Sequence, residues 1–94
     1  MRITHEQLIG LPVYTQSRQD LGRVAGFEMD TEQQVIRTYV VKKSALLKEL
    51  FAQAKYLYIS NSQVVSLTDE EMVVIDSVAA EAEKKQTSKK AIPA

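Results

Sequence analysis

The chain has 94 residues, a hydrophobic fraction of 45% and 12 basic residues balanced by 12 acidic ones, so its formal net charge is zero. The length suits one domain with one modest core, and the apolar content argues against wholesale disorder. The absence of cysteine excludes disulfides and thiolate metal sites. The neutral charge balance gives no general support to binding of nucleic acid or membrane, although it leaves room for a local basic patch.

Neither a membrane helix nor a signal peptide is predicted. No apolar run approaches the length needed to span a bilayer, and the N-terminal segment MRITHEQLIG lacks the apolar core of a secretory signal. We therefore expect a soluble, cytoplasmic protein without membrane insertion.

The first element expected along the chain is one helical turn at the sequence T-H-E-Q. This is a capping box, in which the Thr4 hydroxyl accepts from the amide of Gln7 and the Gln7 side chain accepts from the amide of Thr4. Ile3 and Leu8 occupy the two positions of a hydrophobic staple. Gly10 follows where a left-handed residue would end the turn.

Residues 8–30 predict a β-hairpin, to which the later strands are expected to add. Pro12 stands at the start of the first strand, where its missing N–H does least harm. In the second strand the apolar residues change parity between Val24 and Phe27, and a strict alternation cannot place both on one face. A β-bulge near Gly26 would restore the alternation, since glycine inside a strand often marks a bulge.

A strand and a short helix are expected next. Residues 35–42, VIRTYVVK, are the most β-prone in the chain because they are rich in branched and aromatic side chains. Over residues 44–54, apolar side chains recur at helical spacing, and Ser44 is a suitable N-cap. These apolar residues are Leu46, Leu47, Leu50, Phe51 and Ala54. The pattern predicts a short amphipathic helix or helical loop.

Three short strands complete the expected sheet. They span residues 56–60, 64–67 and 72–76. In the first of them, Leu57 and Ile59 share one face, whereas Tyr56 and Tyr58 share the other. About six strands joined by polar turns, with little room for crossover helices, favour an all-β fold. We predict a small, mostly antiparallel β-barrel with one short helix.

The C-terminal segment has a different composition. Residues 77–94 are rich in Ala, Glu and Lys, which favours helix, but they offer almost no apolar side chain for docking. We expect a helical or disordered tail there. The predicted division is a β domain at residues 1–76 and a polar tail at residues 77–94.

Several of these segments resemble PRC-barrel domains. The opening hairpin of that family is similar to LIGLPV at residues 8–13, LGRV at residues 21–24 and the following Asp30. The closing strands of the family are similar to the segments that begin at Tyr58, Val64 and Met72. The resemblance extends from residue 8 to residue 76, which is nearly all of the predicted β domain.

The resemblance implies a β-barrel that makes protein–protein contacts and does not catalyse a reaction. Similar barrels form the cytoplasmic part of the photosynthetic reaction-centre H subunit and the C-terminal domain of a bacterial ribosome maturation protein, which engages a small-subunit ribosomal protein. Stand-alone versions occur in bacteria and archaea, and some archaeal ones are linked to cell division. The chain has no membrane helix like that of the H subunit and no room for the maturation protein's N-terminal domain. The insert at residues 44–54 matches no role known in the family.

The titratable residues form no catalytic set. His5 is the only histidine and has no partner for metal binding or acid–base chemistry, so we interpret it as a surface residue of the first turn. The run Asp69, Glu70 and Glu71 offers carboxylates for a cation but is more typical of a solvated turn. We predict a non-enzymatic protein without a cofactor.

The aromatic and apolar residues favour partner binding. Tyr56 and Tyr58 are our first candidates for anchors because aromatic side chains dominate protein interfaces. Leu46, Leu50 and Phe51 of the insert are the other predicted contact residues. We expect a protein partner and self-association, with a homodimer favoured, because the chain has no net charge and a small barrel leaves strand edges exposed.

The alternative hypothesis is an RNA- or ribosome-associated maturation factor. Lys42, Lys43, Lys48 and Lys55 offer a basic surface beside tyrosines on which bases could stack. Against this, the acidic residues equal the basic ones in number and no RNA-binding signature is present, so solvated lysines are favoured. The alternative predicts binding that weakens steeply as the salt concentration rises.

Overall fold

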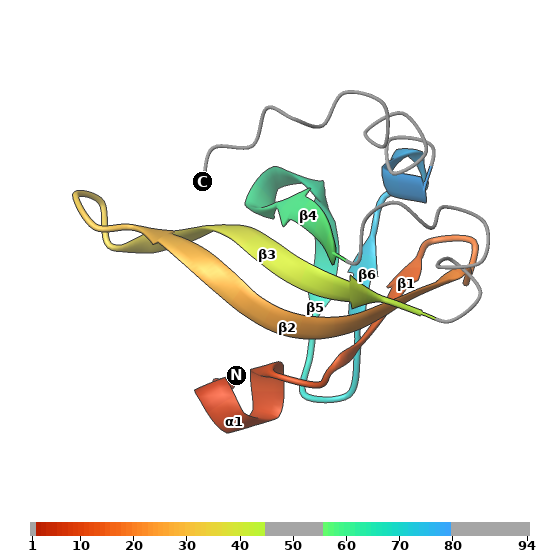
Figure 1. Cartoon of the computed structure of the whole chain (residues 1–94), viewed down its shortest axis with the longest axis horizontal. Coiled ribbons are helices and arrows are strands. Elements are labelled where there is room, and N and C mark those ends of the chain that lie inside the picture. The colour runs from red at the N-terminus through yellow and green to blue at the C-terminus, as the bar shows by residue number, and fades with distance from the viewer. Residues whose placement is uncertain (1, 45–55, 80–94) are drawn as a thin grey trace.

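The structure, a computed structural model, describes residues 2–44 and 56–79. Six strands form one β-sheet, with a single helical turn before it and a 3₁₀ turn within it (Figure 1). The helical turn α1 spans His5–Leu8 and the 3₁₀ turn η1 spans Asn61–Gln63. The strands are β1 (Pro12–Thr15), β2 (Asp20–Asp30), β3 (Val35–Lys43), β4 (Tyr56–Ser60), β5 (Val64–Leu67) and β6 (Met72–Val74). The predicted all-β class is confirmed.

The order of strands in the sheet is β4-β3-β2-β1-β6-β5. All neighbouring strands are antiparallel except β1 and β6, which are parallel. The sequence predicted a barrel, but this sheet has two ends, β4 and β5, which do not pair with each other. Figure 1 shows β5 and β6 behind the β2–β3 hairpin, so the sheet curls without closing. A closed barrel would need β4 to pair with β5. These two strands are instead joined by a capped 3₁₀ turn, η1.

The helical turn α1 forms as the capping box predicts. The Thr4 hydroxyl accepts the N–H of Gln7 at 3.2 Å, and the Gln7 side chain accepts the N–H of Thr4 at 2.9 Å. The turn places Leu8 in the core, where it is 4% exposed. Gly10 has φ +93°, and its N–H donates to the carbonyl of Val24 at 2.7 Å. The first turn is therefore tied to the middle of β2.

The core lies inside the curl of the sheet. Its buried apolar side chains come from α1, the segment between α1 and β1, all strands except β5, and the segment after β6. They are Leu8, Leu11, Val13, Leu21, Val24, Tyr39, Val41, Leu57, Ile59, Met72, Val74 and Val78. Residues 77–79 are helical and Val78 is 1% exposed, so the packed part of the chain extends beyond residue 76. The rest of the predicted tail, residues 80–94, lies outside the described residues, as does the predicted helix at residues 44–54 apart from Ser44.

The β-bulge predicted in β2 lies between Val24 and Gly26, which pair with adjacent residues of β3. Gly26 itself lies outside the left-handed region, and a Cβ added there would meet nothing within 4 Å. The bulge therefore does not depend on glycine. Gly22 does need to be glycine, because it has φ +138° and a Cβ there would overlap the carbonyl oxygen of Lys42.

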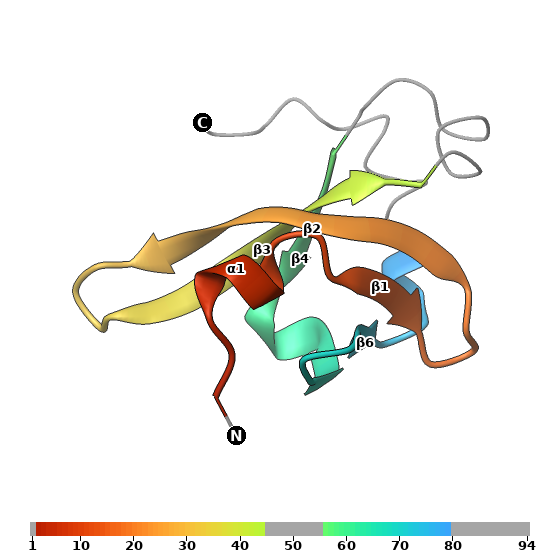
Figure 2. The same ribbon diagram turned by 90° about the horizontal axis from the view of Figure 1, so that it is seen from below.

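The far end of the β2–β3 hairpin, residues 27–37, forms an arm that extends past the other strands (Figures 1 and 2). Its turn is held by Asp30, whose carboxylate accepts the N–H groups of Glu32 at 2.9 Å and Gln33 at 3.3 Å. The arm carries Phe27 and Met29 beyond the core. They are 36% and 51% exposed.

Candidate interaction surface

The end strand β4 has the alternation that its sequence predicts. Leu57 and Ile59 are 3% and 0% exposed, whereas Tyr56 and Tyr58 are each 43% exposed. β4 pairs with β3 through all five of its residues without a register shift. The inner face of this strand therefore belongs to the core, and its outer face presents both tyrosines.

Two cations lie in the same row as one of these tyrosines. Lys42 of β3 pairs with Arg23 of β2 on one side and with Tyr56 of β4 on the other. Directly opposite residues of an antiparallel pair share a face, so Arg23, Lys42 and Tyr56 all lie on the outer face. We call Arg23, Lys42, Tyr56 and Tyr58 the β4 face.

The two cations of the β4 face are exposed and oppose each other directly. The guanidinium of Arg23 donates to the carbonyl of Gly10 at 3.1 Å. Within residues 2–44 and 56–79, neither Arg23 nor Lys42 forms an ion pair. Like charges directly opposite across two strands are unfavourable, so the β4 face suits a partner that brings negative charge close to them.

The outer edge of β4 is also open with respect to the described strands. β4 is the last strand of the sheet on this side, so no described strand pairs with the backbone groups along its outer edge. Its sequence, YLYIS, contains no charged residue, proline or glycine. Charged residues, proline and bulges are the features that normally prevent a strand edge from pairing with another chain. β4 has none of them.

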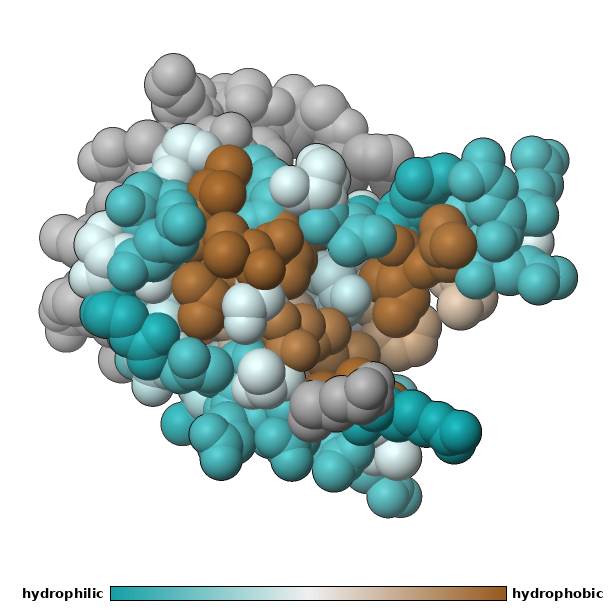
Figure 3. Space-filling view, turned by 180° about the vertical axis from the view of Figure 1, so that it is seen from behind, coloured by the Kyte–Doolittle hydropathy of each residue, from teal (hydrophilic) through white to brown (hydrophobic). Residues whose placement is uncertain are grey.

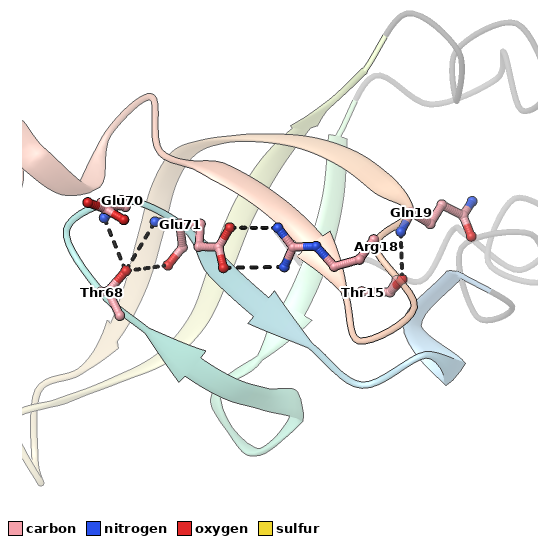
Figure 4. Close-up of polar contacts among 6 residues, drawn as sticks. All are labelled: Thr15, Arg18, Gln19, Thr68, Glu70 and Glu71. Atoms are coloured by element: carbon pink, nitrogen blue, oxygen red, sulfur yellow. Dashed lines mark hydrogen bonds and ion pairs between the residues drawn. The ribbon is translucent and has the colours of Figure 1, made fainter.

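The other end of the sheet, β5, differs. It spans four residues, and a register shift between Val64 and Ser66 interrupts its pairing with β6. The turn that follows is held by Thr68, whose hydroxyl accepts the N–H groups of Glu70 at 3.1 Å and Glu71 at 3.2 Å (Figure 4). This edge is therefore short, bulged and followed by an acidic turn.

The acidic turn is tied to the hairpin between β1 and β2. Arg18 donates to both carboxylate oxygens of Glu71, at 2.8 and 3.2 Å (Figure 4). The Arg18 guanidinium also lies over the ring of Tyr14, 4.5 Å from its centre. These hydrogen bonds from Arg18 hold the pKa of the Glu71 carboxyl below its ordinary value. No sequence pattern predicted this pair, because its members are far apart along the chain.

The metal candidates of the sequence were His5 and the run Asp69, Glu70 and Glu71. His5 is exposed on α1, as predicted, and its ring contacts Phe27 edge-on at a centroid distance of 6.3 Å. No three or more acidic or histidine side chains of the described residues come together in a way that could hold a metal ion. The Glu71 carboxylate already accepts two hydrogen bonds from Arg18.

One pocket of about 290 Å³ lies at the end of the β2–β3 pair. Its walls are Asp20, Gly22, Arg23, Lys42, Lys43 and Ser44. Lys43 was expected among solvated lysines, but it is only 4% exposed, because it follows Val41 on the inner face of β3. This burial lowers the pKa of the Lys43 ammonium group. The pocket therefore brings Lys43 close to the two cations of the β4 face.

The remaining predicted contact residues lie outside the described part of the chain. This applies to Leu46, Leu50 and Phe51, and also to Lys48 and Lys55 of the predicted basic surface. Of the predicted partner site, the structure therefore places Tyr56 and Tyr58, and it adds Arg23, which the sequence did not single out. Only the strand register brings Arg23 beside Lys42 and Tyr56.

Apolar side chains also gather on the face of the molecule that lies behind the view of Figure 1. In Figure 3 they cover the arm and the region of β5 and β6, with paler residues between the two groups. The exposed large apolar residues are Phe27, Met29 and Val35 on the arm and Val65 on β5. Val65 stands at the register shift of β5, where its side chain is 49% exposed. This apolar surface is thus divided between two elements.

Taken together, the fold defines a small all-β domain built from one strongly curled, mostly antiparallel sheet. The chain belongs to the PRC-barrel domain family, whose model matches residues 2–81. The predicted resemblance is thereby confirmed, and the match includes the buried Val78. A search of the curated proteins finds no significant match. The PRC-barrel domain is not a known enzymatic fold. Among the described residues, no helix has the length and apolarity required to cross a membrane.

Proposed function

We propose that this PRC-barrel protein is a non-enzymatic interaction module that contributes a binding surface to a larger protein assembly. The observation that carries the proposal is the pair Tyr56 and Tyr58, each 43% exposed on the outer face of an end strand that has no charged residue. Tyrosine supplies a large, rigid contact area with a polar tip, and it is enriched among the residues that dominate binding energies. The cysteine-free composition is compatible with the cytoplasm, which we propose as its location.

The charges around the tyrosines indicate the chemistry of the partner. Arg23 and Lys42 oppose each other beside Tyr56 and have no ion-pair partner within the described residues. An acidic side chain of a partner protein would relieve this repulsion while its apolar neighbours pack on the tyrosines. We therefore propose a protein partner with an acidic and apolar contact segment.

RNA binding is the second candidate, and the same row of residues favours it. Bases can stack on Tyr56 and Tyr58 while phosphates lie near Arg23 and Lys42. Two exposed cations neutralise few phosphates, however, and the affinity of non-specific RNA binding comes mainly from such contacts. A protein partner therefore has the stronger support.

The test is a tagged pull-down of the full chain from native lysate, at low and moderate salt, with and without nuclease. Wild type is compared with the double variant Tyr56→Ser/Tyr58→Ser and with the control Val65→Ser, which removes a comparably exposed apolar residue from the other end strand. We expect proteins retained by wild type and Val65→Ser after nuclease, and lost from the double variant. The same proteins on all three baits would contradict the proposed surface. Material that disappears with nuclease would establish the RNA alternative.

A further inference from the structure

We infer that β4 pairs with β4 of a second copy of this chain, antiparallel and across a two-fold axis at Tyr58. This inference rests on the proposed function and names one partner of the interaction module. Paired in this way, the two six-stranded sheets become one continuous sheet, and the two β4 faces lie side by side.

The edge of β4 has the properties that such pairing needs. Its five residues are regularly paired to β3 without a bulge, so its outer backbone groups form an uninterrupted row. The residues are β-prone, and none carries a charge or lacks a backbone N–H. A second β4 has the same uncharged sequence, so it brings no charge to the junction.

The burial pattern of β4 restricts the register. Directly opposite residues of an antiparallel pair lie on the same face of the sheet. A two-fold axis perpendicular to the sheet must therefore place one residue directly opposite its own counterpart. Any other register would set an inner-face residue opposite an outer-face residue. An axis at Tyr58 is the one that pairs all five residues of Tyr56–Ser60 with five residues of the second copy. Shifting the axis to Leu57 or Ile59 leaves residues unpaired at both ends.

This register also matches side chains of the same character. On the outer face Tyr58 lies opposite its own counterpart, forming an aromatic cross-strand pair. On the inner face Leu57 lies opposite Ile59 of the second copy, and the symmetry repeats this contact. Leu57 and Ile59 are 3% and 0% exposed, so each stays within the core of its own copy and leaves no unpaired polar or charged group at the junction.

A second copy fits this edge better than the other possible occupants. RNA does not hydrogen-bond to a strand edge in this way, and an acidic protein segment would be drawn to Arg23 and Lys42, which lie further into the sheet. The chain has no net charge, so two copies do not repel each other as a whole. The second edge, β5, is unsuitable because its pairing is interrupted at Val65.

Cysteine cross-linking tests the register directly, since the natural chain contains no cysteine. In the purified Tyr58→Cys variant, the two cysteines of a dimer would lie directly opposite, with Cα atoms about 4.5–5.5 Å apart, which a disulfide spans. In Tyr56→Cys, each cysteine would be offset from its counterpart by four residues, about 13 Å along the strand and beyond the reach of a disulfide. Val65→Cys is the control on the other edge, and circular dichroism checks that all three variants are folded.

We expect Tyr58→Cys to form a covalent dimer at least about tenfold faster than the other two variants under mild oxidation. Equal rates for all three, or fastest cross-linking of Tyr56→Cys or Val65→Cys, would overturn the inference. A wild-type protein that sediments at 10.6 kDa at every concentration would also overturn it. Either result would leave the proposed function standing, because the pull-down measures the binding of other proteins and not the pairing of two copies.

Discussion

The two ends of the sheet face the same physical problem and meet it in different ways. β5 is short and bulged, and the Arg18–Glu71 ion pair fastens its following turn to the β1–β2 hairpin. β4 is regular, uncharged and carries two exposed tyrosines. Only three residues, those of η1, separate the two strands along the chain. The sheet therefore has a bulged edge at β5, which is poorly suited to pairing with another strand, and a regular edge at β4, which is suited to it.

If the proposed function holds, binding depends on the edge of β4, which no described strand covers, more than on composition. The net charge and apolar content of the chain are unremarkable for a globular domain. The strand register, however, brings Arg23, Lys42 and Tyr56 into one row beside that edge. A barrel closed between β4 and β5 would have no such edge.

The largest expected effect is at Gly22 of β2, which pairs with Lys43 of β3, the strand beside β4. Ala at this position would place its Cβ on the Lys42 carbonyl and hold a side chain at φ +138°. We expect Gly22→Ala to lower the free energy of unfolding by about 3 kcal/mol or more. The control Gly26→Ala, with open space around it, should change the free energy by no more than about 1 kcal/mol. Urea denaturation of both variants measures the difference, and equal stabilities would remove Gly22 from this role.

The β6 side of the sheet should depend on Val78. This side chain is 1% exposed and packs in the core beyond the last strand. Val78→Ala should cost about 2 kcal/mol, the combined effect of lost apolar burial and a small cavity. Ser77→Ala, at the exposed neighbouring position, should leave the denaturation midpoint unchanged. A Val78→Ala variant as stable as wild type would show that the fold ends before this residue.

Charge placed on each edge should separate the two strands in their effect on self-association. Tyr58→Lys sets two ammonium groups opposite each other at the proposed axis, so we expect self-association to weaken about tenfold or more. Val65→Lys carries the same charge on β5 and should associate like wild type. Sedimentation equilibrium of both proteins provides the measurement. If Val65→Lys dissociates and Tyr58→Lys does not, the roles of the two edges are reversed.

Acid should affect the β5 and β6 side more than β4, and this is the smallest expected effect. The pKa of Glu71 is lowered by hydrogen bonds from Arg18, and the pKa of Asp76 by hydrogen bonds from Ser17. A carboxyl whose pKa is lower in the folded state stabilises the fold above its ordinary pKa, and this contribution is lost as the pH falls through the folded value.

The melting temperature should therefore fall below about pH 4.5, the ordinary value for a glutamate. Glu71→Gln should lower the melting temperature slightly at neutral pH and make it less sensitive to acid. Thermal melts of both proteins across this range check the prediction. An identical acid dependence in the two proteins would mean that the Arg18–Glu71 pair does not contribute to stability.

Local patterns in the sequence predicted the elements well. The capping box at Thr4, the bulge near Gly26 and the two faces of β4 all depend on residues close together in the chain, and all were confirmed. Long-range features were not predictable in the same way. The parallel pairing of β1 with β6 joins segments far apart, and no periodicity specifies which edge remains unpaired.

The candidate site shows the same division. Alternation along β4 predicted that Tyr56 and Tyr58 would share a face opposite Leu57 and Ile59. The addition of Arg23 needed the register of β2 on β3, which a bulge shifts by one residue. Lys43 was misplaced for a related reason, because its position on the inner face follows from where the buried alternation of β3 ends.

The proposed open edge is tested most directly by amide hydrogen exchange of the intact protein at low and high concentration. Pairing of β4 with a second copy should slow exchange in Tyr56–Ser60 as the concentration rises, while exchange in Val64–Leu67 stays unchanged. Exchange in β4 that is independent of concentration, or slowing confined to β5, would contradict the assignment of β4 as the interacting edge.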